Sequence, residues 1–201
     1  KMVEINACAG NLLTNPVRTD LEEAINYIPV DFIVNVVLNE DKEIIKAVTR
    51  LRQKRAVELE LAGNIWDSAL EEEIRHSQGV AFHGYLNRSE IQQLLDNVRV
   101  GLVILHPTPN HLNSLPIKMF EYMAAGIPLI ASDFPVWREI IMKHDCGLLV
   151  DSYDVQGIVN AMDFLFSNPK RALEIGSNGQ KAIASELNWD SEFRQLLKLY
   201  R

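Results

Sequence analysis

The segment from His106 to Gly126 holds the residues best suited to chemistry. It reads HPTPNHLNSLPIKMFEYMAAG, in which a loop rich in Pro, Asn and Ser follows an apolar strand. We expect a helix from about Pro116 to Ala125, because proline suits the first helical turn, where its missing N–H would be unpaired anyway. The N–H groups of that turn and the positive end of the helix dipole favour phosphate. The segment therefore predicts a phosphate-binding helix terminus at the end of a strand.

The side chains of this helix are unusually distributed. Apolar residues cover two of its sides, with Ile117, Phe120 and Ala124 on one and Met119 and Met123 on the other. A narrow polar strip of Lys118, Glu121 and Tyr122 separates them, so we expect a mostly buried helix. Two interpretations of the charges stay open. In one, Lys118 and Glu121 neutralise each other at their three-residue spacing. In the other, Glu121 accepts hydrogen bonds from two sugar hydroxyls while Lys118 neutralises phosphate charge.

Short apolar runs alternate with amphipathic stretches from residue 31 onward. We expect strands over 31–38, 57–62, 79–83, 98–105, 128–132 and 147–150, and helices over 40–53, 66–76, 87–95, 116–125, 136–144, 155–166, 170–184 and 190–200. Strands alternating with helices of about ten residues are typical of βαβ units. We therefore predict an α/β fold: a Rossmann-like, doubly wound, mostly parallel sheet of about six strands with helices on both faces. Such a sheet binds ligands at the carboxyl ends of its strands, where the strand order reverses.

The bulk properties exclude several classes of protein. The net charge of −7 over 201 residues argues against a general nucleic-acid binder. No apolar run approaches the roughly 20 residues that cross a bilayer, and the first residues lack the pattern of a secretory signal, so we expect a cytoplasmic protein. Cys8 and Cys146 are far apart and are expected to be free thiols. The five histidines show no spacing typical of a zinc site.

A family resemblance follows from the same residues. The run HPTPN…SLPIKMFEYMAAGIPLIASDFP, with CGLLVD after it and a late Asn188-Trp189, resembles the C-terminal domain of family 4 retaining glycosyltransferases of the GT-B fold. The resemblance covers about residues 31–201 and is most specific over 104–151. Residues 31–201 are then a Rossmann-like nucleotide-sugar-binding domain, and residues 1–30, which do not fit the alternation, are an interdomain linker or edge segment.

The resemblance also implies an activity. The C-terminal domain of such an enzyme binds a nucleotide diphosphate sugar, such as a UDP- or GDP-hexose, and an N-terminal domain, missing here, binds the acceptor. The implied reaction transfers a hexosyl group, with retention of anomeric configuration and without a metal or other cofactor, to a glycan or lipid-linked acceptor. The implied setting is surface polysaccharide biosynthesis, with peripheral membrane attachment through the missing domain. A chain without that domain is expected to have little activity alone.

The donor motif of the family has two glutamates separated by seven residues. The second falls on Glu121, which the resemblance assigns to the ribose hydroxyls, and the first falls on Asn113, where the family residue contacts the transferred sugar. The backbone N–H groups of the stretch Ser114, Leu115 and Ile117 would hold the diphosphate, with Lys118 as a helper. Asn113 keeps hydrogen-bonding capacity but carries no charge, which is a departure from the family pattern.

Other family contacts fall on the ends of the strands. Gly63-Asn64 matches a glycine turn near the ligand, Tyr85-Leu86 matches the loop whose backbone reads the base, and His106 lies beside the sugar without acting as a base. A second departure lies in residues 35–43, NVVLNEDKE, which lack the Gly-rich turn of the family. Lys42 aligns with the expected cation, but three acids surround it and would repel phosphate.

Alternatives from other classes stay open. A degenerate, non-catalytic Rossmann-like module that binds a partner would explain both departures. A sugar-nucleotide epimerase or a phosphorylase shares the architecture but fits the EYMAAG-P stretch poorly. The fold alone does not separate these functions.

Overall fold

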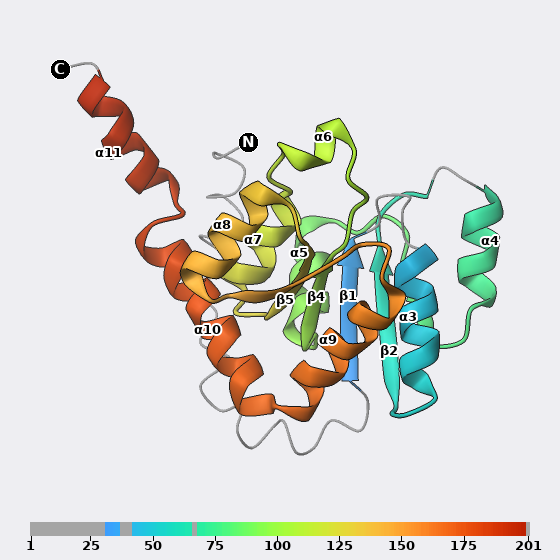
Figure 1. The fold of residues 1–201 in the computed structure, drawn as a ribbon. Coiled ribbons are helices and arrows are strands. Elements are labelled where there is room, and N and C mark those ends of the chain that lie inside the picture. Colours follow the sequence, from blue (N-terminus) through green and yellow to red (C-terminus); the bar gives the residue numbers. More distant parts are fainter. Residues whose placement is uncertain (1–30, 37–41, 66–67, 200–201) are drawn as a thin grey trace.

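The computed structural model describes residues 31–36, 42–65 and 68–199, so the predicted linker over 1–30 lies outside the described residues. The strands are β1 (Asp31–Val36), β2 (Val57–Ala62), β3 (Val80–Phe82), β4 (Val100–Val103), β5 (Leu129–Ser132) and β6 (Gly147–Val150). They form one sheet in the order β3-β2-β1-β4-β5-β6, and every neighbouring pair is parallel (Figure 1). The predicted α/β class with parallel strands is confirmed.

The strand order reverses beside β1. From β1 the chain runs outward through β2 to β3, then returns to the other side of β1 and runs outward again through β4, β5 and β6. The switch point therefore lies between β1 and β4, which pair from Ile33 opposite Val100 to Asn35 opposite Leu102. Because all strands are parallel, their carboxyl ends lie along the same edge of the sheet. A ligand site is expected at this edge.

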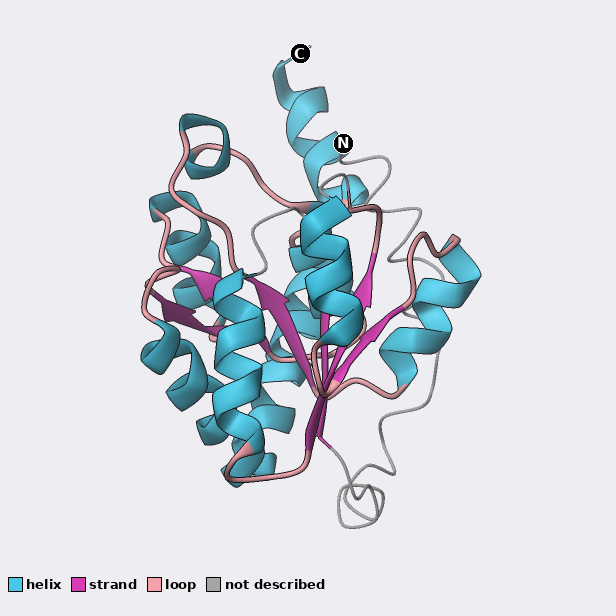
Figure 2. Ribbon diagram, turned by 90° about the vertical axis from the view of Figure 1, so that its right-hand side faces the viewer, coloured by secondary structure: helices cyan, strands magenta, loops and turns pink. Residues whose placement is uncertain are grey.

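Helices cover both faces of the sheet (Figure 2). They are α3 (Lys42–Arg52), α4 (Ser68–His76), α5 (Arg88–Asp96), α6 (Pro109–Leu112), α7 (Ile117–Ala124), α8 (Pro135–His144), α9 (Val155–Ser167), α10 (Pro169–Ser185) and α11 (Trp189–Leu199). A strand was expected over 98–105, but the observed strand β4 is shorter. A loop was expected before α7, but this segment contains the short helix α6. Within the described residues, no helix is long and apolar enough to span a membrane.

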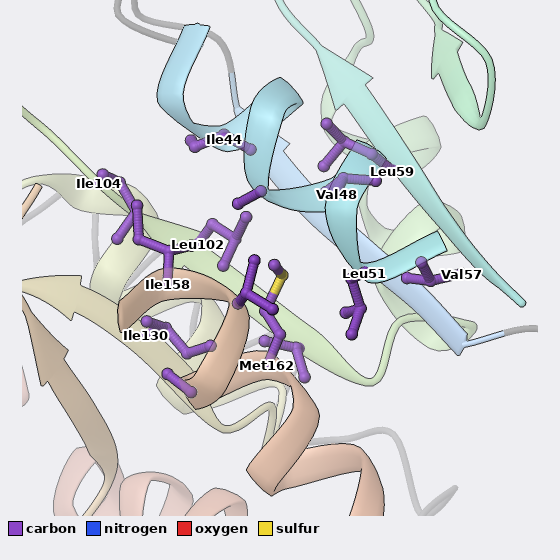
Figure 3. Close-up of a cluster of buried hydrophobic side chains, with 14 of the residues drawn as sticks. Ile44, Val48, Leu51, Val57, Leu59, Leu102, Ile104, Ile130, Ile158 and Met162 are labelled. Carbon is purple, nitrogen blue, oxygen red and sulfur yellow. The ribbon is translucent and has the colours of Figure 1, made fainter. Parts of the chain in front are cut away.

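The core divides into two layers, one on each face. On the first face, Val48 and Leu51 of α3 and Ile158 and Met162 of α9 pack against strand residues such as Leu102 (Figure 3). On the other face, buried residues of α5, α7 and α8 pack against β4 and β5. This coverage of both faces explains why β4 and β5, which are buried at every residue, have almost no polar side chains.

Helix α7, which carries the predicted phosphate site, is buried between the sheet and α10. Tyr122 of α7 lies so close to Gly101 of β4 that a Cβ at Gly101 would approach the ring to 2.4 Å. On the opposite side, a Cβ at Gly176 of α10 would lie 2.0 Å from the carbonyl oxygen of Gly126, just after α7. In the polar strip, Lys118 is 5% exposed and Tyr122 is 1% exposed, whereas Glu121 is half-buried. The prediction of a mostly buried helix is confirmed.

Gly176→Ala tests this close packing. Alanine normally stabilises a helix interior by about 1 kcal/mol relative to glycine. Here we expect the opposite sign, a loss of about 1–3 kcal/mol, because the new methyl group meets backbone that cannot give way. Urea unfolding measures the difference. Gly157→Ala on α9 is the matched control, since the three atoms nearest to its Cβ belong to the side chain of Asp154 and not to backbone. A stabilised Gly176→Ala variant would show that α10 does not clamp α7 in this way.

Cys146 is a free thiol, as predicted, and lies buried in the second core layer. Burial raises the pKa of this thiol to about 12, because the thiolate loses its hydration in apolar surroundings. The thiolate is the reactive form, so the folded protein keeps this cysteine inert at ordinary pH.

Alkylation checks this property. At pH 8 a thiol of pKa about 12 is ionised in only about one molecule in ten thousand, so iodoacetamide should leave Cys146 unmodified in the folded chain. Unfolding in guanidinium returns the pKa to its ordinary range and should expose the thiol to rapid labelling. Mass spectrometry of the peptide containing Cys146 gives the readout. Equal labelling before and after unfolding would contradict the assignment.

Candidate functional site

The predicted site residues gather along the carboxyl edge of the sheet. Gly63 and Asn64 follow β2, and Tyr85 and Leu86 follow β3. The N–H of Gly63 donates to the carbonyl of Gly84 at 2.7 Å, which joins the two loops. Both glycines have positive φ, 133° and 66°, which other residues adopt with strain. The two turns therefore hold Asn64 and Tyr85 exposed at this edge, with Tyr85 74% exposed.

A second group lies at the switch point. His106 follows β4, and its Nε2 is 3.2 Å from the Oε2 of Glu43, in the first turn of α3 after β1. The His106 ring stacks on Tyr153 from the loop after β6, with ring centroids 4.5 Å apart and an interplanar angle of 24°. The His111 Nδ1 lies 2.9 Å from the His106 carbonyl oxygen. Three separate segments thus meet at His106.

The structure places one of the acids after β1, Glu43, at the switch point. Glu43 is one of the three acids that were expected to repel phosphate, and its carboxylate contacts the His106 imidazole rather than pointing into open solvent. The neighbouring Lys42 is exposed at the first position of α3. The other two acids, at positions 40 and 41, lie outside the described residues.

The loop that leads into α7 is tightly organised. The N–H of Ser114 donates to the His111 carbonyl at 3.3 Å, and the Ser114 hydroxyl donates to the same oxygen at 3.3 Å. Asn113 ends α6, and its side chain is exposed. A protein carbonyl thus already accepts from the Ser114 N–H, which was one of the amides predicted to hold a diphosphate. The other two predicted amides are those of Leu115 and Ile117, and no described residue accepts a hydrogen bond from either of them.

The start of α7 retains the character predicted for it. Pro116 is the N-cap residue, and within the described residues no side chain caps the helix there. The Met119 N–H donates to the Pro116 carbonyl at 3.1 Å, and the positive end of the helix dipole still favours an anion at this helix end. Lys118 is buried in this first turn, and Glu121 is half-buried one turn further along. Lys118 and Glu121, two of the predicted donor-binding residues, are thus carried by a single helix.

Sequence reasoning did not find several residues of this region. Trp137 is fully buried in α8, and its Nε1 donates to the Ser114 carbonyl at 2.6 Å. A buried tryptophan N–H needs an acceptor, and this is the signal that could have pointed to Trp137. Nothing in the sequence spacing pairs Glu43 with His106 or Tyr153 with His106. In the part of the chain that the structure describes, no group of three His, Cys, Asp or Glu side chains could hold a metal ion.

Comparison with known proteins decides the family. The model of the family described as "Glycosyl transferases group 1" matches residues 40–182, well over half of the chain. The chain belongs to this glycosyltransferase family. The fold agrees, since this glycosyltransferase domain superposes on the C-terminal domain of the group 1 protein LpcC from Francisella tularensis with a TM-score of 0.67 at 19% identity, covering 88% of this chain and 94% of that one. The resemblance to the C-terminal domain of a GT-B enzyme is confirmed.

Other relatives are longer than this glycosyltransferase chain. The chain is 25% identical over 162 residues to MMP alpha-(1->4)-mannosyltransferase from Mycolicibacterium hassiacum, covering 78% of this chain but 38% of that protein. HepE from Anabaena, solved in complex with UDP-glucose, matches with a TM-score of 0.70 at 17% identity, covering 94% of this chain and 54% of that one. The chain therefore spans about half or less of the length of these two relatives.

Tyr153→Ala tests the arrangement around His106. The His106 side chain is 26% exposed and is covered on one side by the Tyr153 ring, so removal of the ring should increase its modification by diethyl pyrocarbonate. Peptide mass spectrometry follows the rate, with exposed His76 as an internal reference. Tyr85→Ala, which removes an exposed tyrosine from a different loop of the same edge, should leave the His106 rate unchanged. An unchanged rate in Tyr153→Ala would contradict the stacking.

Proposed function

We propose that this chain binds a nucleotide diphosphate sugar as the donor half of a retaining glycosyltransferase. One observation carries the proposal: the uncapped N-terminus of α7, with Glu121 one turn further along, follows the carboxyl end of β4 beside the switch point. Sheets of this type bind nucleotides at that place, and helix N-termini favour phosphate. Family membership supports the same assignment.

The residues take distinct roles in this proposal. The N–H groups of Leu115 and Ile117 hold the diphosphate, with Lys118 contributing positive charge. Glu121 accepts hydrogen bonds from the two ribose hydroxyls, because a carboxylate offers two acceptor oxygens to a vicinal diol. Asn113 lies on the side of the transferred sugar.

The remaining strand ends complete the donor site. Gly63 and Asn64 line it with backbone after β2, and the backbone of Tyr85 and Leu86 reads the base. His106 lies beside the sugar, and Lys42 is the available cation at the start of α3. These contacts are spread along one edge of the sheet, which suits an extended ligand with base, ribose, diphosphate and sugar in sequence.

The complete enzyme requires more than this chain. We propose that an N-terminal domain binds a glycan or lipid-linked acceptor and that a hexosyl group is transferred to it, in surface polysaccharide biosynthesis and without a metal. The lengths of the relatives support this division, since the chain covers 54% of HepE and 38% of the mannosyltransferase. The donor half alone should bind nucleotide but turn over little, because catalysis needs donor and acceptor held together.

Glu121→Ala tests the donor site. Calorimetric titration of the 201-residue chain with UDP and with GDP should show binding of one of them. Loss of hydrogen bonds to a charged acceptor costs about 1.5–3 kcal/mol, so we expect the variant to bind that nucleotide at least about tenfold more weakly. Glu139→Ala, which removes an exposed carboxylate from α8, is the control and should bind like the parent. Equal affinity of Glu121→Ala and the parent would refute the ribose contact.

A second candidate is a non-catalytic module that keeps the fold and binds a partner. The observation that favours it is the Glu43 carboxylate at the switch point, 3.2 Å from the His106 Nε2, where a diphosphate would come close. The uncharged Asn113, which stands in place of a family glutamate, also favours the non-catalytic module. The titration separates the two candidates. No detectable binding of UDP, GDP or UDP-glucose at millimolar concentration would favour the non-catalytic module.

A further inference from the structure

The peptide unit between Ser114 and Leu115 connects the buried core with the outer edge of the domain. Its carbonyl oxygen, on Ser114, accepts the hydrogen bond from the Trp137 Nε1 at 2.6 Å. Its N–H belongs to Leu115, whose side chain is 37% exposed. Among the described residues, none accepts a hydrogen bond from that N–H. One side of this peptide is therefore bound inside the protein, and the other donates to no described residue.

Peptide geometry links the two sides. In a trans peptide the C=O and N–H point in opposite directions within one plane, and no described peptide bond is cis. The indole that fixes the Ser114 carbonyl therefore also fixes the direction of the Leu115 N–H, which points away from Trp137. A hydrogen bond accepted at the carbonyl also polarises the N–H of the same unit and strengthens it as a donor.

Trp137 is held rigidly enough to set this direction. It is 0% exposed in the first turn of α8, and its ring packs against that of Phe134 with centroids 4.6 Å apart. The Phe134 N–H donates to the Ser132 carbonyl at 2.9 Å. The Ser132 hydroxyl in turn lies 2.8 Å from both the N and the O of Leu105. The start of α8 is thus tied to the chain segment that leaves β4 and enters the loop before α7.

We propose that Trp137 is a positioning residue for the donor diphosphate: its indole N–H orients the Ser114–Leu115 peptide so that the Leu115 N–H donates to a phosphate oxygen. This role depends on the proposed donor site and adds to it a residue that does not itself touch the ligand. It also explains the location of a polar tryptophan atom in an otherwise apolar layer. A shift of the peptide plane would misdirect the N–H even if α7 stayed in place.

Trp137→Phe removes the indole N–H and keeps an aromatic ring in the core. We expect this variant of the 201-residue chain to bind UDP, or GDP if that is the nucleotide bound by the parent, about tenfold more weakly, the effect of one lost hydrogen bond to a charged group. Binding of the matching nucleoside, uridine or guanosine, followed by ligand-observed NMR, should stay within about twofold, because it has no phosphate to meet the peptide. Ile141→Val, a trimmed buried side chain on the same helix, is the control for core disturbance and should change neither affinity.

The outcomes separate this role from simple packing and from the proposed function. Equal weakening of nucleotide and nucleoside in Trp137→Phe would show a structural role only and overturn the inference, as would unchanged nucleotide affinity. If the parent binds neither UDP nor GDP, the proposed function fails and this role fails with it. If the Trp137→Phe variant does not fold, a hydrogen-exchange measurement on the parent chain still tests the proposal. Saturation with the nucleotide, but not with the nucleoside, should slow amide hydrogen exchange in the peptide that contains Leu115. Unchanged exchange there would also overturn the proposal.

Discussion

The packing of α7 between the sheet and α10 is the constraint on which the site depends. Gly101 lets the Tyr122 ring lie directly on β4, and Gly176 lets α10 approach the chain that leaves α7. Helix termini are useful for binding only when their direction is fixed, and here packing on opposite sides fixes it. The predicted phosphate end and Glu121 thus belong to one rigid body. A larger residue at either glycine would move both together.

Most of the architecture could be predicted because it follows from local patterns. Apolar runs such as the one ending at Leu105 mark strands covered on both faces, and strand–helix alternation makes the strands parallel. Because parallel strands end at the same edge of the sheet, the turns at Gly63 and Gly84 could be predicted to lie at the same edge as His106, even though their contacts could not. The burial of α7 could be predicted as well, because apolar residues cover two of its sides. The packing partners of the helix could not be predicted, since they are distant in sequence, such as Gly101 beside Tyr122.

The contacts that sequence reasoning missed join residues that share no spacing rule. Glu43 and His106 are 63 positions apart, and Trp137 and Ser114 are 23 positions apart. Such pairs depend on the exact rotation of helices after strands, which periodicity does not give. Helix α6 is a different kind of miss. Thr108 followed by Pro109 is an N-cap with proline at the first helical position, and the Thr108 side chain accepts from the His111 N–H. The proline-rich composition obscured a signal that was present.

The contact between Glu43 and His106 has a consequence for how a diphosphate would be held in the proposed donor site. In the family pattern that the sequence resembles, a Gly-rich turn after the first strand contacts the diphosphate. In this chain the corresponding helix α3 begins with Lys42 and with a carboxylate that engages His106 across the switch point. A carboxylate in that place opposes phosphate from the β1 side. In the proposed donor site, the α7 side would then supply most of the attraction, through the Leu115 and Ile117 amides and Lys118. The orientation of a single peptide at Leu115 would consequently matter more in this proposed site than in one where two helix ends share the charge.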